Sequence, residues 1–245
     1  MIIAGNWKMN MDRASAVEWT KGIADQAASM PDGAEMIVFP PAVLIDTVTA
    51  SRGGGALLVG GQDCHHHKSG AHTGDISADM LVDAGCGWVL AGHSERRTDH
   101  GESSHDVAAK ASAALSAGLK VMICVGETLD QRQSGQAFDV VAEQIQQSLP
   151  ADMPKDCFAV AYEPVWAIGT GQVASPEDVD AMHNHIRQVL LALNKEYGQI
   201  DILYGGSVKP DNAAALLALE NVGGALVGGA SLNANDFNAI AQSIS

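Results

Sequence analysis

The chain has 245 residues, 47% of them hydrophobic and 18% charged, with a formal net charge of −15. That length can bury a large core, and the composition is that of a globular protein. No apolar run reaches the roughly 18 residues of a membrane helix, and the excess of acid argues against nucleic-acid or anionic-membrane partners.

The cellular compartment follows from the termini and the cysteines. The first residues, MIIAGNWKMN, lack the apolar core of a signal peptide. The four cysteines lie far apart without a CxxC pair, which is typical of a reducing compartment without disulfides. We therefore expect a cytoplasmic protein.

Short β-branched runs alternate with helical patterns along the whole chain. In chain order, strands are predicted at Ile2–Ala4, Met36–Phe39, Ala56–Gly61, Trp88–Ala91, Lys120–Val125, Phe158–Tyr162, Ile200–Tyr204 and Gly224–Val227. Helices are predicted between them around Ala16–Ala27, from about Val43, and over Ser77–Asp83, Asp106–Ala117, Phe138–Leu149, Ser175–Leu193, Asn212–Leu219 and Asp236–Ile244.

The helix after the sixth strand has the clearest start signal. Ser175 can cap it, Pro176 occupies the first helical position, and Asp178 supplies an acid at the third. Its predicted buried face consists of Val179, Met182, Ile186, Val189 and Leu193.

These elements predict an α/β fold. Eight strand–helix units follow one another at roughly the length of a βαβ unit, and the short strands are apolar on both faces, as in a covered parallel sheet. No linker or charge block divides the chain. We therefore expect a single TIM-barrel catalytic domain over residues 1–245, a (β/α)₈ barrel of eight parallel strands ringed by helices.

Polar residues follow several of the predicted strands. Asn6 and Lys8 come after the first strand, His93 after the fourth and Glu163 after the sixth. Each alone is more often structural than functional. In a barrel, however, chemistry lies just beyond the C-terminal ends of the strands, so their joint occurrence at one rim indicates an active site.

The stretch AYEPVWAIGTG, residues 161–171, places Glu163 at the end of a strand and before a mostly apolar loop. Loss of hydration there is expected to raise the pKa of the carboxyl group toward the range of a general base. Pro164 stiffens one end of the loop and Gly169 and Gly171 loosen the other, which is the composition of a lid.

Glycine-rich turns follow the last two strands. They read Gly205-Gly206-Ser207 and Gly228-Gly229-Ala230-Ser231, and such turns present backbone N–H groups to an anion. Oriented dipoles of this kind can hold a phosphate even though the net charge of the chain repels it.

Six segments together resemble the triosephosphate isomerase family: GNWKMN, AGHSERR, CVGE, AYEPVWAIGTG, YGGSV and VGGASL. The resemblance runs from the first strand to the last. It implies interconversion of the small-molecule substrates dihydroxyacetone phosphate and glyceraldehyde 3-phosphate through a cis-enediolate, in glycolysis and gluconeogenesis, without cofactor or metal.

The same resemblance assigns roles to residues. Glu163 is expected to be the base, and His93 a neutral electrophile beside a helix N-terminus. Lys8 and Asn6 hold the substrate and its developing charge. Substrate binding further involves Gly169, Ser207, Gly228 and Gly229, and supporting roles fall to Ser94, Glu95, Tyr204 and Trp166. Ser94 is expected to bond the resting Glu163, Glu95 to fix Lys8, Trp166 to anchor the lid, and Tyr204 with Ser207 to latch it over residues 164–174.

Two segments depart from the family pattern. The far lid hinge is Gln172-Val173-Ala174, where the family often has Lys-Thr-Ala, and His72 stands where an aromatic residue usually precedes Thr73. The resemblance still implies a homodimer, formed through the loop Gln62–Asp75, with Thr73 near the partner's Asn6.

The run Cys64-His65-His66-His67 in that loop is weighed as a metal site. Adjacent loop residues rarely converge on one ion, and no spaced second pair is evident in the sequence, so no metal is expected. Two other functions stay open on the residues alone. Another phosphate-binding barrel enzyme, such as an indole-glycerol-phosphate synthase type, would share the glycine turns without needing Asn6, Lys8, His93 and Glu163 together. A non-catalytic barrel scaffold would be expected to have lost some of the four.

Overall fold

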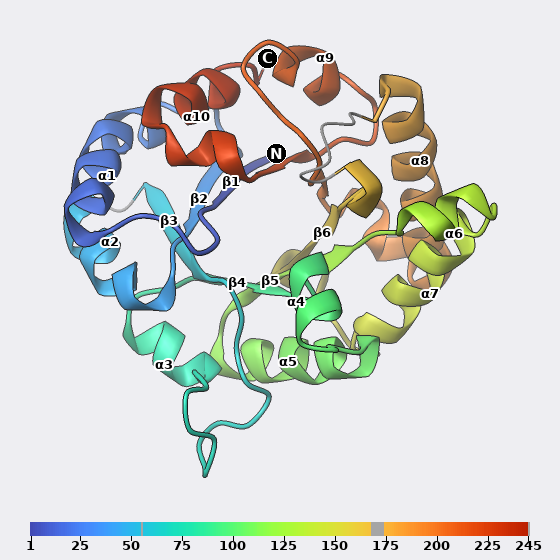
Figure 1. Ribbon diagram of the computed structural model, residues 1–245, viewed down its shortest axis with the longest axis horizontal. Coiled ribbons are helices and arrows are strands. Elements are labelled where there is room, and N and C mark those ends of the chain that lie inside the picture. The colour runs from blue at the N-terminus through green and yellow to red at the C-terminus, as the bar shows by residue number, and fades with distance from the viewer. Residues whose placement is uncertain (55, 168–173, 245) are drawn as a thin grey trace.

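The computed structural model describes residues 1–54, 56–167 and 174–244, and it forms a closed parallel barrel in the order β1-β2-β3-β4-β5-β6-β7-β8 (Figure 1). The strands are β1 Ile2–Asn6, β2 Glu35–Phe39, β3 Leu57–Gly61, β4 Trp88–Ala91, β5 Lys120–Val125, β6 Phe158–Tyr162, β7 Ile202–Tyr204 and β8 Gly224–Val227. The predicted fold class is confirmed.

Helices surround the barrel on the outside (Figure 1). The α-helices are α1 Arg13–Ala27, α2 Ile45–Ser51, α3 Ala78–Asp83, α4 Ser94–Asp99, α5 Ser104–Ala117, α6 Leu129–Gln133, α7 Ala137–Ser148, α8 Pro176–Leu193, α9 Ala213–Leu217 and α10 Ala234–Ala241. Short 3₁₀ turns are η1 Ala42–Leu44, η2 Lys155–Cys157, η3 Val165–Ala167, η4 Lys195–Gln199 and η5 Gly229–Leu232. Capping boxes begin α1, α5, α6 and α8, and the predicted box of α8 uses Ser175 and Asp178.

Alternation along the strands produces two cores. One set of side chains points into the barrel: Ile2, Ala4, Ile37, Phe39, Trp88, Leu90, Met122, Cys124, Ala159, Ala161, Leu203 and Leu226. The alternate positions, such as Ile3, Val38 and Val89, pack outward against the helices. Because both faces are covered, the strands read as apolar runs, as the sequence suggested.

The barrel closes between the two ends of the chain. Residues 2–5 of β1 pair with residues 224–227 of β8. Gly224 has φ +150°, and a Cβ there would lie 1.9 Å from the carbonyl oxygen of Ile2, so closure requires glycine. At the functional rim, a Cβ on Gly126 would lie 1.8 Å from the carbonyl oxygen of Glu163. The end of β5 must therefore lack a side chain for β6 to deliver Glu163.

Most predicted boundaries agree with the structure, and three details are wrong. Leu193 was expected in the buried face of α8 but is 45% exposed, because it is the last helical residue. The separate helix α6 was not predicted, and β7 begins at Ile202 and not at residue 200. Within the described residues, no helix is both long and apolar enough to span a bilayer.

Candidate active site

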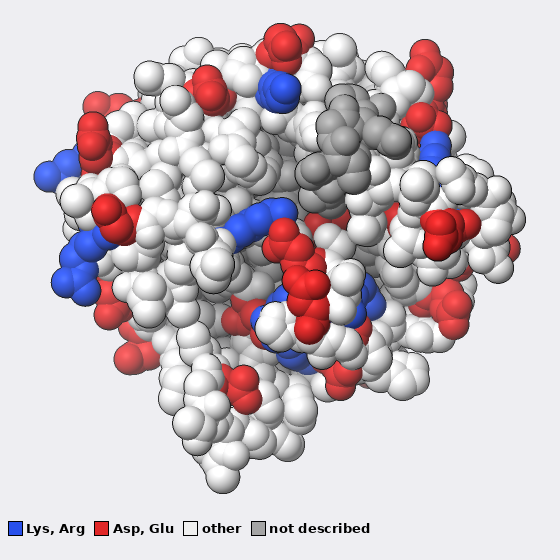
Figure 2. Space-filling view, viewed as in Figure 1, with Lys and Arg blue, Asp and Glu red and all other residues white. Residues whose placement is uncertain are grey.

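The C-terminal ends of the strands surround a hollow. Figure 2 shows it near the middle of this face, with basic and acidic side chains at its edge. The cavity measures about 490 Å³. Every predicted catalytic or substrate-binding residue within the described part of the chain lines it: Asn6, Lys8, His93, Glu163, Ser207, Gly228 and Gly229.

Glu163 is fixed by the start of helix α4. Its backbone N–H donates to the carbonyl of Val125 on β5 at 2.7 Å, which holds the end of β6 against its neighbour. Its side chain is only 2% exposed and accepts two hydrogen bonds from Ser94, at 3.0 Å from the backbone N–H and 3.1 Å from Oγ. His93 Nε2 lies 2.9 Å from Glu163 Oε1. A carboxylate and an imidazole thus meet at one wall of the cavity.

The pKa of Glu163 corrects a prediction. Burial raises it, as expected from the lost hydration, but His93 and the two Ser94 donors outweigh burial, and the net direction is downward. Hydrogen bonds and an adjacent imidazole favour the charged carboxylate more than the apolar surroundings disfavour it. In this arrangement the carboxylate is ionised and held, which differs from the raised pKa that composition alone predicted.

Opposite influences act on His93. Burial lowers the pKa of the imidazole, but the Glu163 carboxylate raises it, and the net direction is upward. The N–H of Glu95 donates to His93 Nδ1 at 3.3 Å, which opposes a second proton on the ring. The expectation of an uncharged ring therefore depends on Glu163. While the carboxylate is in contact, protonation is favoured; without it, burial and the helix N-terminus favour the neutral form.

A salt bridge fixes Lys8. Its Nζ lies 2.7 Å from Glu95 Oε1, the partner that the resemblance assigned. The backbone of Lys8 has φ +50°, and its N–H donates to Asn6 Oδ1 at 3.0 Å. Gln62, which the sequence reasoning did not assign to the site, donates from Nε2 to the carbonyls of Lys8 at 2.8 Å and Phe39 at 2.9 Å. The strained turn at Lys8 is thus held from both sides.

The glycine-rich turns after β7 and β8 form the opposite wall, together with residues such as Val208 and Lys209. Ser207, Gly228 and Gly229 follow β7 and β8 and line the cavity. Gly228 precedes the turn η5, and its carbonyl accepts from Ser231 N at 2.8 Å and Oγ at 2.7 Å. The Oγ of Ser231 also lies 3.4 Å from the carbonyl oxygen of Asn6. Ser231, another residue without a predicted role, thus joins the glycine turn to the end of β1.

The near end of the predicted lid is anchored on a buried acid. Trp166 Nε1 donates to Glu127 Oε1 at 2.8 Å, and Tyr162 Oη donates to the same oxygen at 3.1 Å. Arg132 contacts Glu127 at 3.2 Å and lies 4.5 Å over the Trp166 ring. Glu127 belongs to the CVGE segment, but its fully buried position and three partners emerge only from the fold.

Other lid residues lie outside the described part of the chain. These are residues 168–173, among them Gly169, Gly171, Gln172 and Val173. Ala174 is described and buried. The predicted latch residue Tyr204 is 1% exposed, and its hydroxyl has no hydrogen-bond partner among the described residues.

Arg97 supports the wall that carries Glu163 and His93 from the side away from the cavity. The sequence reasoning did not assign it a role. It is half-buried and donates to neutral acceptors. These are the carbonyls of Gly92 at 2.8 Å and Cys124 at 3.2 Å, and the hydroxyls of Ser104 at 3.0 Å and Ser148 at 3.2 Å. Gly92 follows β4 and Cys124 lies near the end of β5, so the guanidinium joins the strand that precedes His93 and Ser94 to the strand that pairs with β6. Arg97 belongs to the segment SERR, and the sequence does not indicate which of its two arginines points inward.

In the loop after β3, Cys64 and the three histidines that follow it are arranged differently from what their adjacent positions in the sequence suggest. Cys64 is 2% exposed and directs its thiol toward the carbonyl of Lys110 at 3.9 Å, away from the histidines. His65 instead meets His72 and Asp75, whose ligand atoms lie within 4.8 Å of one another. The donor atoms that lie near one another thus come from both limbs of the loop and not from the four consecutive residues alone.

The fold and the site define a class: a (β/α)₈ barrel in which a buried carboxylate and an imidazole share a cavity with two glycine-rich turns. The family model "Triosephosphate isomerase" matches residues 1–244. The chain belongs to the triosephosphate isomerase family and is an isomerase.

Individual relatives agree with the family model. The triosephosphate isomerase of Caulobacter vibrioides is 52% identical over 244 residues, covering 99% of this chain and 96% of the relative. That of Bradyrhizobium sp. is 54% identical over 243 residues, covering 98% and 96%. The crystal structure of triosephosphate isomerase from Bartonella henselae superposes with a TM-score of 0.91 at 43% identity, covering 99% of this chain and 98% of that one.

Proposed function

We propose that this chain interconverts dihydroxyacetone phosphate and D-glyceraldehyde 3-phosphate, as a glycolytic isomerase. The observation that carries the proposal is the 2.9 Å contact between His93 Nε2 and Glu163 Oε1 in the wall of a cavity whose opposite wall consists of glycine-rich turns. Proton transfer next to a carbonyl needs a base and an electrophile at adjacent atoms, and a triose phosphate needs an anion corner a few ångströms away.

Glu163 is the base in this proposal. Both of its oxygens are occupied by Ser94 and His93, so the carboxylate leaves these partners to reach a substrate carbon. The partners hold its pKa down while burial raises it. When the carboxylate leaves these partners it remains buried. Its pKa therefore rises toward the working range of a base.

His93 and Lys8 stabilise the charge that develops on the substrate oxygens. Once Glu163 departs, burial and the Glu95 N–H favour a neutral imidazole with its hydrogen on Nε2, which faces the cavity. That N–H donates to the carbonyl oxygen and exchanges protons with the enediolate. General base catalysis supplies about 10²–10⁴-fold and each positioned oxyanion donor about 2.7–4 kcal/mol, so several groups have to act together.

Phosphate binding is assigned to the N–H groups of Ser207, Gly228 and Gly229, joined by Gly169 of the lid. Residues 164–174 act as that lid, with Trp166 anchored on Glu127 and with Tyr204 and Ser207 as latch. Because β1 and β8 both contribute to the cavity and pair with each other, we assign residues 1–245 to one catalytic domain. The free cysteines fit a cytoplasmic location.

A homodimer through the loop Gln62–Asp75 is part of the proposal. A second hollow of about 530 Å³ adjoins the active site and is lined by Asn6, Lys8 and His93 on one side and Asp99 and His100 on the other. Met9, which lines this hollow, is 94% exposed, and further large apolar side chains are exposed elsewhere: Val43 at 81%, and Met80 and Val82 on α3 at 57% and 41%. A second copy that inserts its loop, with Thr73 near the partner's Asn6, would cover this hollow.

The isomerase assignment and the homodimer are tested separately. A coupled spectrophotometric assay with glyceraldehyde 3-phosphate should show turnover that a non-reacting phosphate analogue inhibits competitively; no turnover in either direction would refute the isomerase assignment. Sedimentation at micromolar chain concentration should give the mass of a dimer, whereas a monomer would contradict the loop interface.

A further inference from the structure

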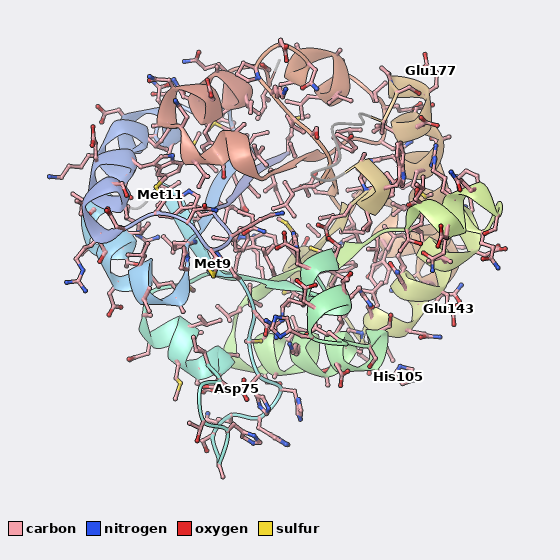
Figure 3. All side chains as sticks on the ribbon, viewed as in Figure 1. Met9, Met11, Asp75, His105, Glu143 and Glu177 are labelled. Carbon is pink, nitrogen blue, oxygen red and sulfur yellow. The ribbon has the colours of Figure 1, made fainter. Side chains whose placement is uncertain are left out.

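One glutamine of helix α7 is directed at the rim of the barrel. Gln144 lies on the face of α7 that also carries the buried residues Val141, Ile145 and Ser148, at the spacing of a core-facing stripe. Its neighbour Glu143 lies on the outer surface of α7 and is exposed (Figure 3). A polar side chain on the inner face has to find its partners within the protein, and the half-buried Gln144 finds them just beyond β5.

The amide of Gln144 pairs with both backbone groups of Gly126. Its Oε1 accepts the Gly126 N–H at 2.8 Å, and its Nε2 donates to the Gly126 carbonyl at 3.0 Å. The paired register of β5 and β6 ends at Val125 and Tyr162, so Gly126 lies beyond the strand ladder. A glycine has no side chain to restrict its backbone. The two hydrogen bonds from Gln144 therefore set the orientation of this residue.

Gly126 in turn contacts the main chain of Glu163. A Cβ on Gly126 would lie 1.8 Å from the carbonyl oxygen of Glu163 and 3.3 Å from its Cα, so the two backbones touch. The carbonyl of Val125, one residue earlier, accepts the Glu163 N–H at 2.7 Å. A displacement of Gly126 therefore reaches the main chain that carries the Glu163 carboxylate.

Glu163 also lies between two spaces. It lines the active-site cavity and, together with Gln144, Gly126 and Ser94, a smaller hollow of about 110 Å³. A residue with space on two sides has fewer packing contacts to hold it in place. Its position therefore depends on hydrogen bonds, those of Ser94 to its side chain and those that fix its main chain through β5 and Gly126.

We propose that Gln144 is a positioning residue for the base Glu163. The inference rests on the proposed isomerase function, in which the Glu163 carboxylate leaves Ser94 and His93 to reach a substrate carbon. The main chain has to stay in place while the side chain moves, since a displacement of about 1 Å can cost about 10²-fold in rate. Gln144 is not among the described residues that line the active-site cavity. Its loss should therefore lower kcat and leave phosphate binding unchanged.

The test is the variant Gln144→Met, which keeps the length of the side chain and removes both hydrogen bonds to Gly126. In the coupled assay with glyceraldehyde 3-phosphate, kcat should fall by about 10–100-fold. Competitive inhibition by inorganic phosphate, which reports on the glycine-rich turns, should stay within about threefold of wild type. Gln147→Met, one turn further along α7, is the matched control: Gln147 is exposed and donates to Glu143 at 2.8 Å. Its kcat should stay within about twofold of wild type.

Circular dichroism establishes that each variant is folded. A folded Gln144→Met with the kcat of wild type would overturn the proposal, and so would an equal loss of kcat and of phosphate affinity, because that indicates a general disruption of the site. If Gln144→Met does not fold, Gln144→Asn takes its place. Asn keeps the amide but is one methylene shorter, and the same separation of kcat from phosphate inhibition is expected.

Failure of both variants to fold would assign the two bonds to the stability of the whole barrel and would overturn a role confined to the base. Wild-type protein is measured in the same assay. If it shows no turnover, the isomerase assignment fails; if it turns over and folded Gln144→Met matches it, the positioning role alone fails.

Discussion

The two walls of the active-site cavity differ in the groups that line them. The wall at β4 and β6 consists of buried side chains that bond to one another, with Glu163 1% and His93 6% exposed. The wall at β7 and β8 is lined by Ser207, Gly228 and Gly229, and the ionisable side chain among its described lining residues is Lys209, which is exposed. One wall pairs ionisable groups in contact with each other, and the glycine-rich turns of the other wall carry none.

This difference matches the two tasks that we propose for the site. Proton transfer needs groups whose pKa values respond to small displacements, and the opposing effects of burial and contact on Glu163 and His93 provide that response. Holding a phosphate needs a fixed field, which oriented N–H groups supply without titrating near neutral pH. Substitutions on the two walls should therefore have separable effects on kcat and on binding.

The largest effect is expected from Glu163→Gln. The amide keeps the size of the side chain but cannot accept the substrate proton, so kcat should fall by at least about 10²–10⁴-fold, while binding of a phosphate analogue stays measurable. The coupled assay and analogue titration measure the two quantities. Glu143→Gln, the same change on an exposed part of α7, is the control, and near-normal turnover in Glu163→Gln would remove the base assignment.

Next in size is Ser207→Asp on the other wall. A carboxylate among donors that face a phosphate adds like-charge repulsion, so analogue binding should weaken by at least about tenfold. Ser207→Asn has nearly the same shape without the charge and should bind far better than Ser207→Asp. Equal affinities for the two variants, determined by inhibition of the isomerase, would place the phosphate elsewhere.

Arg97→Met tests whether the side-chain wall depends on support from behind. It leaves the strand-end carbonyls of Gly92 and Cys124 buried without their donor, so the free energy of unfolding should fall by about 1–3 kcal/mol, and kcat should fall with it because Gly92 precedes His93. Urea denaturation and the assay measure the two. Arg13→Met, at an exposed position of α1, should change neither the free energy of unfolding nor kcat. A stable, fully active Arg97→Met would show that the side-chain wall does not depend on Arg97.

The smallest effect is a pH dependence confined to the side-chain wall. The folded pKa of Glu163 lies below 4.5, so its contribution to stability is present above pH 4.5 and is lost as pH falls through the folded pKa. The folded pKa of His93 lies above 6.5, so its contribution is present below pH 6.5 and is lost as pH rises through the folded pKa. The difference in unfolding free energy between wild type and Glu163→Gln should therefore be largest between pH 4.5 and 6.5.

Urea denaturation across pH 4 to 8 measures this difference. Ser207→Asn serves as the control from the wall at β7 and β8, and its difference from wild type should be flat over the same range. A flat profile for Glu163→Gln as well would mean that the contact between His93 and Glu163 adds no charge-dependent stability.

Local sequence patterns determined the barrel and the rim. Apolar runs that alternate with helical periodicity specify strands and helices through short-range contacts, and parallel strands bring Asn6, Lys8, His93 and Glu163 to one end whatever the details of packing. Leu193 and α6 were misjudged because a stripe of apolar residues does not indicate where a helix leaves the core or where it is interrupted.

The tertiary structure alone decided the charge states and the supporting groups. Glu163 and His93 are 70 positions apart, and the direction of each pKa depends on the 2.9 Å between them, which composition cannot supply. Arg97 and Glu127 act through partners brought close by folding, and His65 gains His72 and Asp75 only because the loop returns on itself. Electrostatic effects fall off with distance, so the sequence names the groups and the fold sets their chemistry.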